Sequence, residues 1–358
     1  MNICHIFLYC RWQSVTFIFI KKYILNMNKM ILNVQNLDFN LRYLKIKTNR
    51  KICAVVKANA YGHGIQEIVK TLSKKIDFFA CANLEEAILL RDFDKQTPTL
   101  ILFNCQDFDL AIKNNLSVSI HTFDQIKLLT NKHKNLKVHI AFNSGMNRLG
   151  FGDFKSFKKA FAMLERKCSI EGVYTHFNTI CSDNQTYKAQ IRQFETIEQF
   201  AKHKNKNIIT HTGGSHDIFN KKFDMIRIGL FLYGYGMEKL KPIMKITTPI
   251  LQINNLKKGQ SCGYDKEYIA NQDCTVATVP VGYQDGIKKF FIGQKCLLGN
   301  QICTIVAICM DCIMIKVPPK TKVGDEICVF YDADLSKEQL NYEVLTGFNG
   351  FRGTRIVE

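Results

Sequence analysis

The sequence predicts an α/β protein in which a closed (β/α)8 barrel of the TIM type is followed by a mostly antiparallel β domain. Between residues 30 and 240, short runs rich in β-branched residues alternate with longer amphipathic segments, which is typical of parallel strands joined by crossover helices. After residue 240, strand-like runs and turn residues dominate, and helical periodicity is scarce. We therefore expect a barrel over residues 30–240 and a β domain over residues 241–358.

Eight runs in the first part have the composition of buried strands, which is the number that a closed (β/α) barrel requires. After the first of them, Ile65, Ile68, Val69 and Leu72 share one face of a helix. The eight runs are 51–56, 77–81, 99–103, 116–120, 137–142, 171–175, 207–210 and 225–228. In the second part, strands are expected within 243–256, 274–281, 295–317 and 326–331.

The first 29 residues differ from the rest of the chain in their pattern of apolar and polar residues. Their two apolar clusters are interrupted by Arg11, Trp12 and Gln13, and neither reaches the roughly 20 residues needed to span a bilayer. They also lack the order of basic start, apolar core and small-residue cleavage site that marks a secretory signal. We interpret residues 1–29 as a non-native or disordered extension ahead of a working start at Met27 or Met30. A weak interfacial anchor is the alternative.

The composition of the 358 residues indicates a soluble globular protein. Hydrophobic residues make up 46% and charged residues 22%, which argues against wholesale disorder and against a multi-spanning membrane protein. The formal net charge of +18 would suit an acidic partner. However, the basic residues are scattered in pairs such as Lys74-Lys75 and form no dense arm. We therefore expect neither a nucleic-acid partner nor a membrane partner.

The fourteen cysteines indicate a reducing compartment. They are spread through apolar runs of a chain that is too large to need disulfide staples, so we expect reduced thiols and a cytoplasmic protein. Cys309 and Cys312 form a C-x-x-C pair, but no second pair stands at zinc-finger spacing. We therefore expect no metal site.

Polar residues that directly follow the predicted strands are the candidates for function, because the active site of such a barrel lies at the carboxyl ends of its strands. Lys57 follows the first strand and opens a small, glycine-containing loop, so it could be a partly desolvated, reactive amine. The alternative is a lysine that extends to water. Other candidates at strand ends are Arg148, His176, Ser215 and Arg227. A lysine, two arginines and a glycine-rich turn together describe a pocket for a phosphate-bearing carbonyl cofactor, and pyridoxal 5'-phosphate is the cofactor that combines these groups.

These residues lie in motifs that resemble those of the alanine racemases. Residues 54–64 read Ala-Val-Val-Lys-Ala-Asn-Ala-Tyr-Gly-His-Gly, which looks like the cofactor-lysine motif of that family. Further matches follow in the same order at 144–150, 175–177, 227–234, 263–264, 281–286 and 309–311. The resemblance covers roughly residues 30–358 and is more specific than any single motif.

The resemblance implies a pyridoxal-phosphate-dependent isomerase that interconverts L-alanine and D-alanine and supplies D-alanine for peptidoglycan. Lys57 would hold the cofactor covalently and act as one catalytic base, and Tyr264 would be the second base. In this family Tyr264 would come from the other protomer of a homodimer with shared active sites. A racemase for another small amino acid such as serine, or a non-catalytic protein that binds pyridoxal phosphate, is the alternative.

The resemblance also assigns binding roles, and it has departures. The implied cofactor-binding residues are Lys57, Tyr61, Arg148, His176, Ser215, Arg227, Gly229 and Leu230. The implied substrate-binding residues are Arg148, Met310, Tyr283 and Asp311. Ala141 stands where many members carry a carbamylated lysine that orients the arginine matched by Arg148. Asn143, Ala307 and Phe351 also depart from the family pattern, and Phe351 predicts a weaker grip on the cofactor phosphate.

Overall fold

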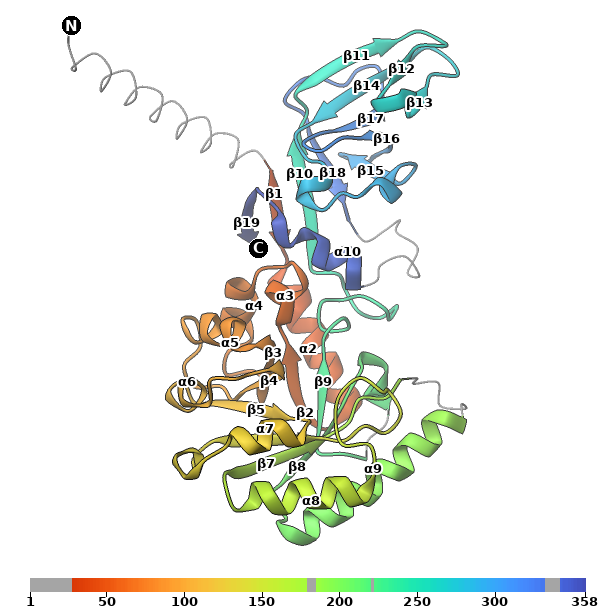
Figure 1. Ribbon diagram of the computed structural model, residues 1–358. Helices are drawn as coiled ribbons and strands as arrows, with labels where there is room; N and C mark the ends of the chain where they lie inside the picture. The colour runs from red at the N-terminus through yellow and green to blue at the C-terminus, as the bar shows by residue number, and fades with distance from the viewer. Residues whose placement is uncertain (1–27, 179–184, 220–221, 332–341) are drawn as a thin grey trace, which may run out of the picture. The chain divides into compact units, whose positions relative to one another are not determined.

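The computed structural model describes residues 28–178, 185–219, 222–331 and 342–358 (Figure 1). The chain forms two compact units. The barrel unit comprises Leu37–Lys241, and the β unit comprises Pro242–Glu358 together with the described residues up to Asn36. The predicted non-native or disordered extension spans residues 1–29, of which residues 1–27 lie outside the described residues. For the last two residues the prediction is wrong, because Asn28 is buried and Lys29 begins a strand.

The barrel unit contains eight parallel strands that close on themselves, as predicted. The last strand pairs with the first, with Ile226 opposite Ile52. All eight predicted runs are strands, and their ends differ from the prediction by only a few residues. The strands are β2 (Lys51–Val55), β3 (Phe78–Asn83), β4 (Thr99–Asn104), β5 (Leu116–Ile120), β6 (Lys137–Ala141), β7 (Ser169–Tyr174), β8 (Ile209–Gly213) and β9 (Met225–Ile228).

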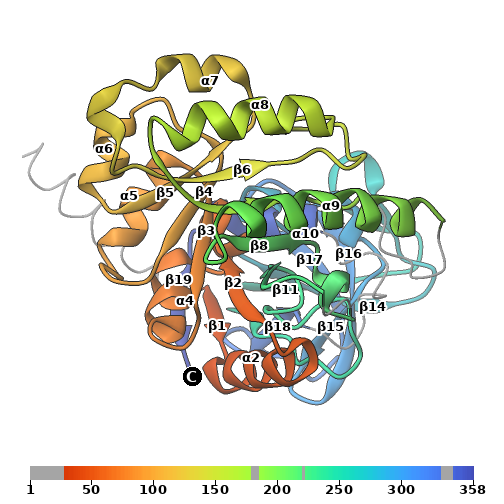
Figure 2. The same cartoon turned by 90° about the horizontal axis from the view of Figure 1, so that it is seen from below.

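Helices lie outside the barrel strands, as Figure 2 shows for α5 to α9. In α8 the side chains of Phe157, Phe161 and Leu164 are buried on one face, and the Asp153 side chain caps the helix by accepting from the amide of Ser156 at 2.8 Å. The helices are α2 (Val34–Thr48), α3 (Lys57–Tyr61), α4 (Ile65–Leu72), α5 (Leu84–Arg91), α6 (Phe108–Lys113), α7 (Phe123–Leu128), α8 (Phe154–Glu165) and α9 (Gln185–Lys204). Two short 3-10 turns are η1 (Asn131–His133) and η2 (Ser215–Phe219).

The β unit is built on a nine-stranded, mostly antiparallel sheet, as predicted. Its strand order is β11-β14-β17-β16-β15-β18-β10-β1-β19, and β12 and β13 form a separate pair. The strands are β1 (Lys29–Leu32), β10 (Met244–Pro249), β11 (Gln252–Leu256), β12 (Ser261–Cys262), β13 (Tyr268–Ile269), β14 (Cys274–Val279), β15 (Lys295–Leu298), β16 (Gln301–Ile308), β17 (Ile313–Val317), β18 (Glu326–Phe330) and β19 (Thr354–Val357). Its helical segments are η3 (Tyr264–Lys266), η4 (Tyr283–Asp285), η5 (Lys289–Phe291), α10 (Tyr342–Gly347) and η6 (Phe348–Gly350).

The start of the barrel differs from the sequence prediction, which placed it at residue 30. The strand Lys29–Leu32 belongs to the β unit, where it pairs antiparallel with β10 and parallel with β19. Met30 and Leu32 are almost completely buried there. The partners of this strand lie more than 200 residues further along the chain, so no local pattern shows the pairing.

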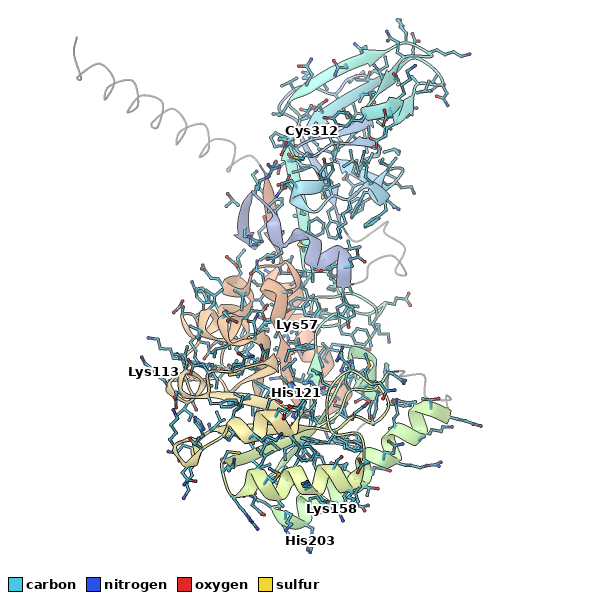
Figure 3. All side chains as sticks on the ribbon, viewed as in Figure 1. Lys57, Lys113, His121, Lys158, His203 and Cys312 are labelled. Carbon is cyan, nitrogen blue, oxygen red and sulfur yellow. The ribbon has the colours of Figure 1, made fainter. Side chains whose placement is uncertain are left out.

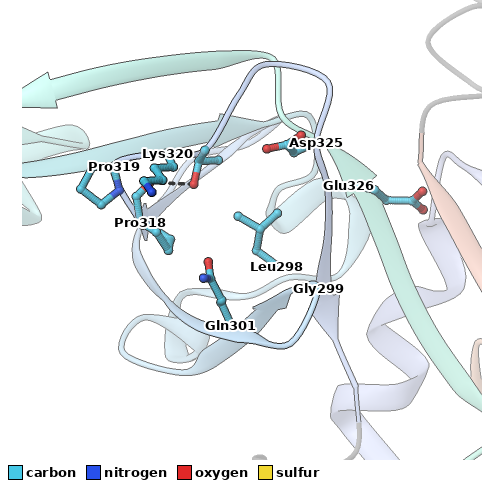
Figure 4. Close-up of a pocket in the computed structure, with 9 residues that line it drawn as sticks. Leu298, Gly299, Gln301, Pro318, Pro319, Lys320, Asp325 and Glu326 are labelled. Atoms are coloured by element: carbon cyan, nitrogen blue, oxygen red, sulfur yellow. Dashed lines mark hydrogen bonds between the residues drawn. The ribbon is translucent and has the colours of Figure 1, made fainter.

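The β unit has a surface hollow that lies apart from the predicted site residues. A hollow of about 570 Å³ in the β unit is lined by Leu298, Pro318, Lys320 and neighbouring residues, and contains none of the predicted site residues (Figure 4). Within the described ranges no helix is long and apolar enough to cross a membrane.

The described cysteines are free thiols, and burial raises the pKa of Cys53 to about 12, so this thiol is unreactive.

Candidate active site

Lys57 stands at the carboxyl end of β2, at the start of α3 in the barrel unit (Figure 3). The next residues, Ala58 to Tyr61, have φ values of 52° to 53° and form a left-handed turn, which costs about 1–2 kcal/mol per residue. The Glu86 carboxylate holds this turn in place by accepting from the amide of Ala58 at 2.7 Å and from that of Ala82 at 2.8 Å. The position of Lys57 is therefore set by a strained backbone that is anchored on a neighbouring strand end.

The amine of Lys57 is shifted toward its neutral form. Burial lowers its pKa, the positive charges of Arg148 and Arg227 lower it further, and Glu86 opposes them. The Lys57 Nζ atom lies 5.3 Å from the centroid of the Phe103 ring. This half-buried setting favours the interpretation of Lys57 as a reactive amine over that of a lysine extended to water.

Arg227 on β9 is buried and is held by directed hydrogen bonds. Its Nη1 donates to His211 Nδ1 at 2.6 Å, and its Nη2 donates to the carbonyl oxygen of Thr175 at 2.9 Å. Its guanidinium also lies over the Tyr174 ring at 4.6 Å. These contacts fix the orientation of the Arg227 guanidinium, which is the one cationic group of strand β9.

A chain of hydrogen bonds leads from Arg227 through the barrel interior to Glu171. His211 Nε2 lies 2.7 Å from His139 Nδ1, and His139 Nε2 lies 3.0 Å from Glu171 Oε2. Because a guanidinium can only donate, His211 accepts at Nδ1 and carries its proton on Nε2, and His139 then does the same. Burial and the charge of Arg227 lower the pKa of His211 well below its ordinary value, which is consistent with a neutral ring.

His139, His211 and Glu171 were missed by the sequence analysis, which considered only residues that follow strands. They lie within β6, β8 and β7, at positions that face one another. Gly172 makes room for His139, since an added Cβ there would lie 2.6 Å from His139 Cε1. Polar residues within buried strands were the signal that could have revealed them.

His176 lies beside Arg227 because residue 213 is a glycine. An added Cβ at Gly213 would lie 2.6 Å from His176 Nδ1 and 3.0 Å from Arg227 Cζ. Burial, with the positive charges of Arg227, Arg148 and Lys57, lowers the pKa of His176 from 6.5 to about 3. His176 is therefore neutral at physiological pH and can pass a hydrogen bond to a neighbour without adding a charge.

We expect His176 to show no titration between pH 5 and 8 in NMR spectra of the cofactor-free protein with labelled histidine, the resonance being assigned by its loss in His176→Gln. The unfolded chain takes up this proton near pH 6.5 and the folded chain only near pH 3. The contribution of His176 to the free energy of unfolding therefore decreases as the pH falls through that window. A titration midpoint near 6.5 in the folded protein would contradict the buried, cation-lined position of the ring.

At the carboxyl end of β9, Tyr61 packs closely against the backbone of Gly229. The Tyr61 side chain is buried, and an added Cβ at Gly229 would lie 2.6 Å from its Oη atom. Leu230 follows Gly229 directly after β9. Ser215 opens η2 directly after Gly214, but its side chain lies outside the described residues. Tyr61, Gly229 and Leu230 thus lie around one strand end.

The β unit brings Tyr283, Met310 and Asp311 together. The amide of Tyr283 donates to the carbonyl oxygen of Cys309 at 3.1 Å, next to Met310. Arg352 binds Asp311 at 2.7 Å. The Tyr283 and Met310 side chains are exposed.

Tyr264 lies in η3 of the β unit and is 69% exposed. Its turn is tied to β16, because Glu267 accepts from the amide of Ile308 at 3.0 Å. An added Cβ at Gly263 would lie 2.7 Å from the Cβ of Ala307, so the backbone before Tyr264 packs closely on this small residue. Ala307, a departure from the family pattern, therefore supports the Tyr264 turn in this chain.

The fold and the site together describe a barrel enzyme with a half-buried lysine amine at the end of the first barrel strand, close to cationic and hydrogen-bonding side chains. The chain belongs to the alanine racemase family. The family model of the alanine racemase N-terminal domain matches residues 32–236, and that of the C-terminal domain matches residues 243–355. The enzymes of this family are isomerases.

Known proteins resemble the chain over most of its length. The alanine racemase of Fusobacterium nucleatum is 34% identical over 349 residues, covering 90% of this chain and 97% of that protein. That of Lactobacillus acidophilus is 31% identical, covering 82% and 84%. Among solved structures, alanine racemase from E. faecalis has a TM-score of 0.85 at 26% identity, covering 93% of this chain and 98% of that one. That of Clostridium difficile has a TM-score of 0.81 at 29% identity, covering 89% and 92%. These similarities confirm the predicted family and fold class.

Proposed function

We propose that the chain is an alanine racemase that interconverts L-alanine and D-alanine with pyridoxal 5'-phosphate and two catalytic bases, and that it supplies D-alanine for peptidoglycan. The observation that carries this proposal is Lys57, a half-buried amine at a strand end whose pKa is lowered by burial and by the charges of Arg148 and Arg227. The relatives that are named alanine racemases cover nearly the whole chain, which supports the same reaction and substrate.

The residues of the barrel unit fit the cofactor. Lys57 offers an amine to an aldehyde, and Tyr61 with the backbone at Gly229 and Leu230 offers a corner for a phosphate. Ser215 is a further phosphate-binding candidate by its sequence position. When bound, the cofactor withdraws electrons from the substrate α-carbon and thereby acidifies its hydrogen.

The arginines orient the ligands. Arg148 carries a positive charge to pair with the substrate carboxylate and the phenolic oxygen of the cofactor. Arg227 would meet the ring nitrogen of the bound cofactor as a hydrogen-bond donor. Its hydrogen bonds to His211 and Thr175 keep it in one orientation, and a guanidinium does not release a proton at neutral pH. Arg227 would therefore hydrogen-bond the ring nitrogen without protonating it.

Two bases on opposite faces of the α-carbon account for racemisation, because a proton removed from one face is returned from the other. Lys57 Nζ moves the proton on one face, and the Tyr264 phenol moves it on the other. Tyr264 would remove the proton as a phenolate. Because the ordinary pKa of tyrosine is near 10, this form requires stabilisation. In this proposal the neutral His176, backed by Arg227, supplies that stabilisation through a hydrogen bond.

The second base comes from another copy of the chain in this proposal. Tyr264, Tyr283 and Met310 are large side chains that remain exposed in the single chain, as expected of a surface that a partner covers. Tyr283, Met310 and Asp311 would then line the approach to the partner's site. The protein would act as a homodimer in the cytoplasm. The free thiols of the described residues support a reducing compartment.

The test of this function is the optical rotation of pure L-alanine incubated with purified protein and added pyridoxal phosphate. We expect the rotation to decay to zero with the wild type and to stay constant with Lys57→Ala. A constant rotation with wild-type protein that retains the cofactor would contradict the proposal. The same measurement on L-serine would then distinguish a serine racemase from a protein that only carries the cofactor.

Gly213→Ala is expected to lower kcat by about a hundredfold while the protein stays folded, since the added methyl group displaces Arg227 and His176 from their shared position. Circular dichroism and the melting temperature report on the fold, and the racemisation rate reports on the site. Gly152→Ala is the matched control, because an added Cβ there meets nothing within 4 Å. Equal rates for the two variants would show that the close contact at Gly213 does not matter.

A further inference from the structure

Arg148 needs a neighbour that holds it in place, and Ala141 does not provide one. The methyl group of Ala141 carries no charge, and Asn143, which stands in the same stretch, uses its side-chain oxygen to accept from the amides of Gly145 and Asn147 at 3.1 and 2.9 Å. Among the described residues, no carboxylate lies within ion-pair distance of Arg148. The guanidinium is thus part of a cationic cluster with Lys57 and Arg227 and has no anion of its own.

The ring of Phe103 lies against two of the three cations of the cluster, Arg148 and Lys57. Phe103 is near the carboxyl end of β4 and points into the site. The Arg148 Cζ atom lies 5.5 Å from its centroid, and the Lys57 Nζ atom lies 5.3 Å from it. Both distances are within the roughly 6 Å over which an aromatic ring attracts a cation.

We propose that Phe103 is a positioning residue of this enzyme, an aromatic platform that holds Arg148 and Lys57 where an anion would otherwise be needed. This inference rests on the proposed racemase function. The electron-rich face of the ring attracts each cation, which offsets part of their mutual repulsion. Because the ring carries no net charge, it holds the Arg148 guanidinium without neutralising the positive charge of that group. Arg148 therefore keeps its full positive charge for the carboxylate of an amino-acid substrate.

The platform has a different effect on each cation. At Arg148 it restricts a long side chain, so its loss weakens the binding of the substrate carboxylate. At Lys57 it stabilises the ammonium form, so its loss lowers the pKa of the amine below its already lowered value. A purely structural role of Phe103 predicts neither of these two specific changes.

The test compares Phe103→Leu, which keeps apolar volume but removes the ring, with Phe103→Tyr, which keeps the ring. Phe93→Leu is the matched control, because Phe93 lies under another lysine of the barrel unit, Lys70, at 5.5 Å. For Phe103→Leu we expect the KM for L-alanine to rise about tenfold with kcat changed less than about threefold, and we expect Phe103→Tyr and Phe93→Leu to stay near the wild type.

A second measurement does not depend on turnover. The pH dependence of Lys57 acetylation in the cofactor-free full-length protein, followed by mass spectrometry, gives the pKa of the amine directly. We expect this pKa to fall in Phe103→Leu and to be restored in Phe103→Tyr. An unchanged KM together with an unchanged pKa would overturn the platform, as would equal effects in Phe93→Leu. If the wild type does not racemise alanine, the proposed function fails, while the acetylation of Lys57 still decides the role of Phe103.

Discussion

Lys57→Ala is expected to lower racemisation by at least about a thousandfold and to abolish covalent retention of the cofactor. The structure gives the reason, because Lys57 is held at the end of β2 by a left-handed turn, and its pKa is lowered by burial and by two arginines. A shorter side chain at this position leaves neither an amine to form the covalent bond nor a base on that face of the α-carbon. The readouts are the racemisation rate and the mass of the protein after borohydride reduction.

The matched control is Lys51→Ala, which removes an exposed lysine at the other end of the same strand. We expect this variant to retain the reduced cofactor adduct and the wild-type rate. If borohydride reduction gave as much cofactor adduct in Lys57→Ala as in the wild type, the covalent role would belong to another lysine. The basis of the proposed function would then be lost.

Tyr264→Phe is expected to slow conversion of L-alanine to D-alanine by two to four orders of magnitude, about the contribution of one general base, with the cofactor still bound. The reverse rate must fall equally, because the two enantiomers have the same free energy. Lys57 remains, so one enantiomer should still exchange its α-hydrogen with solvent deuterium while the other does not. Proton NMR in deuterium oxide measures this asymmetry.

Tyr268→Phe serves as the control for the tyrosine, since Tyr268 lies in the neighbouring strand β13 and its hydroxyl contacts Cys274 Sγ at 3.7 Å. Its racemisation rate should stay near that of the wild type. If Tyr264→Phe also turned over at the wild-type rate, the two-base scheme would be wrong even if the cofactor lysine were correct.

The barrel strands could be predicted because their signal is local. A buried parallel strand reads as a short apolar run, and an amphipathic helix follows it, so 51–56 and the seven later runs were found without tertiary information. The strands β1 and β19 could not be assigned in this way. They pair with each other across nearly the whole chain, and a four-residue strand has no periodicity that indicates its partner.

The residues of the candidate site that lie at strand ends could be predicted from the sequence. Those in the barrel interior could not. Lys57 and Arg227 carry a charge next to an apolar run, which marks them in the sequence. His139 and His211 become meaningful only when closure of the barrel places His139 Nδ1 and His211 Nε2 2.7 Å apart. Phe103 looks like any apolar strand residue until the structure places two cations against its ring.

The central claim is that alanine is racemised between Lys57 of one protomer and Tyr264 of another, and mixing the two inactive variants tests it directly. Lys57→Ala and Tyr264→Phe are unfolded and refolded together, and the racemisation rate of L-alanine is measured. A mixed dimer then has one site with both bases, so about a quarter of the wild-type rate should return. No recovery from a mixture that has formed mixed dimers would contradict the shared two-base site.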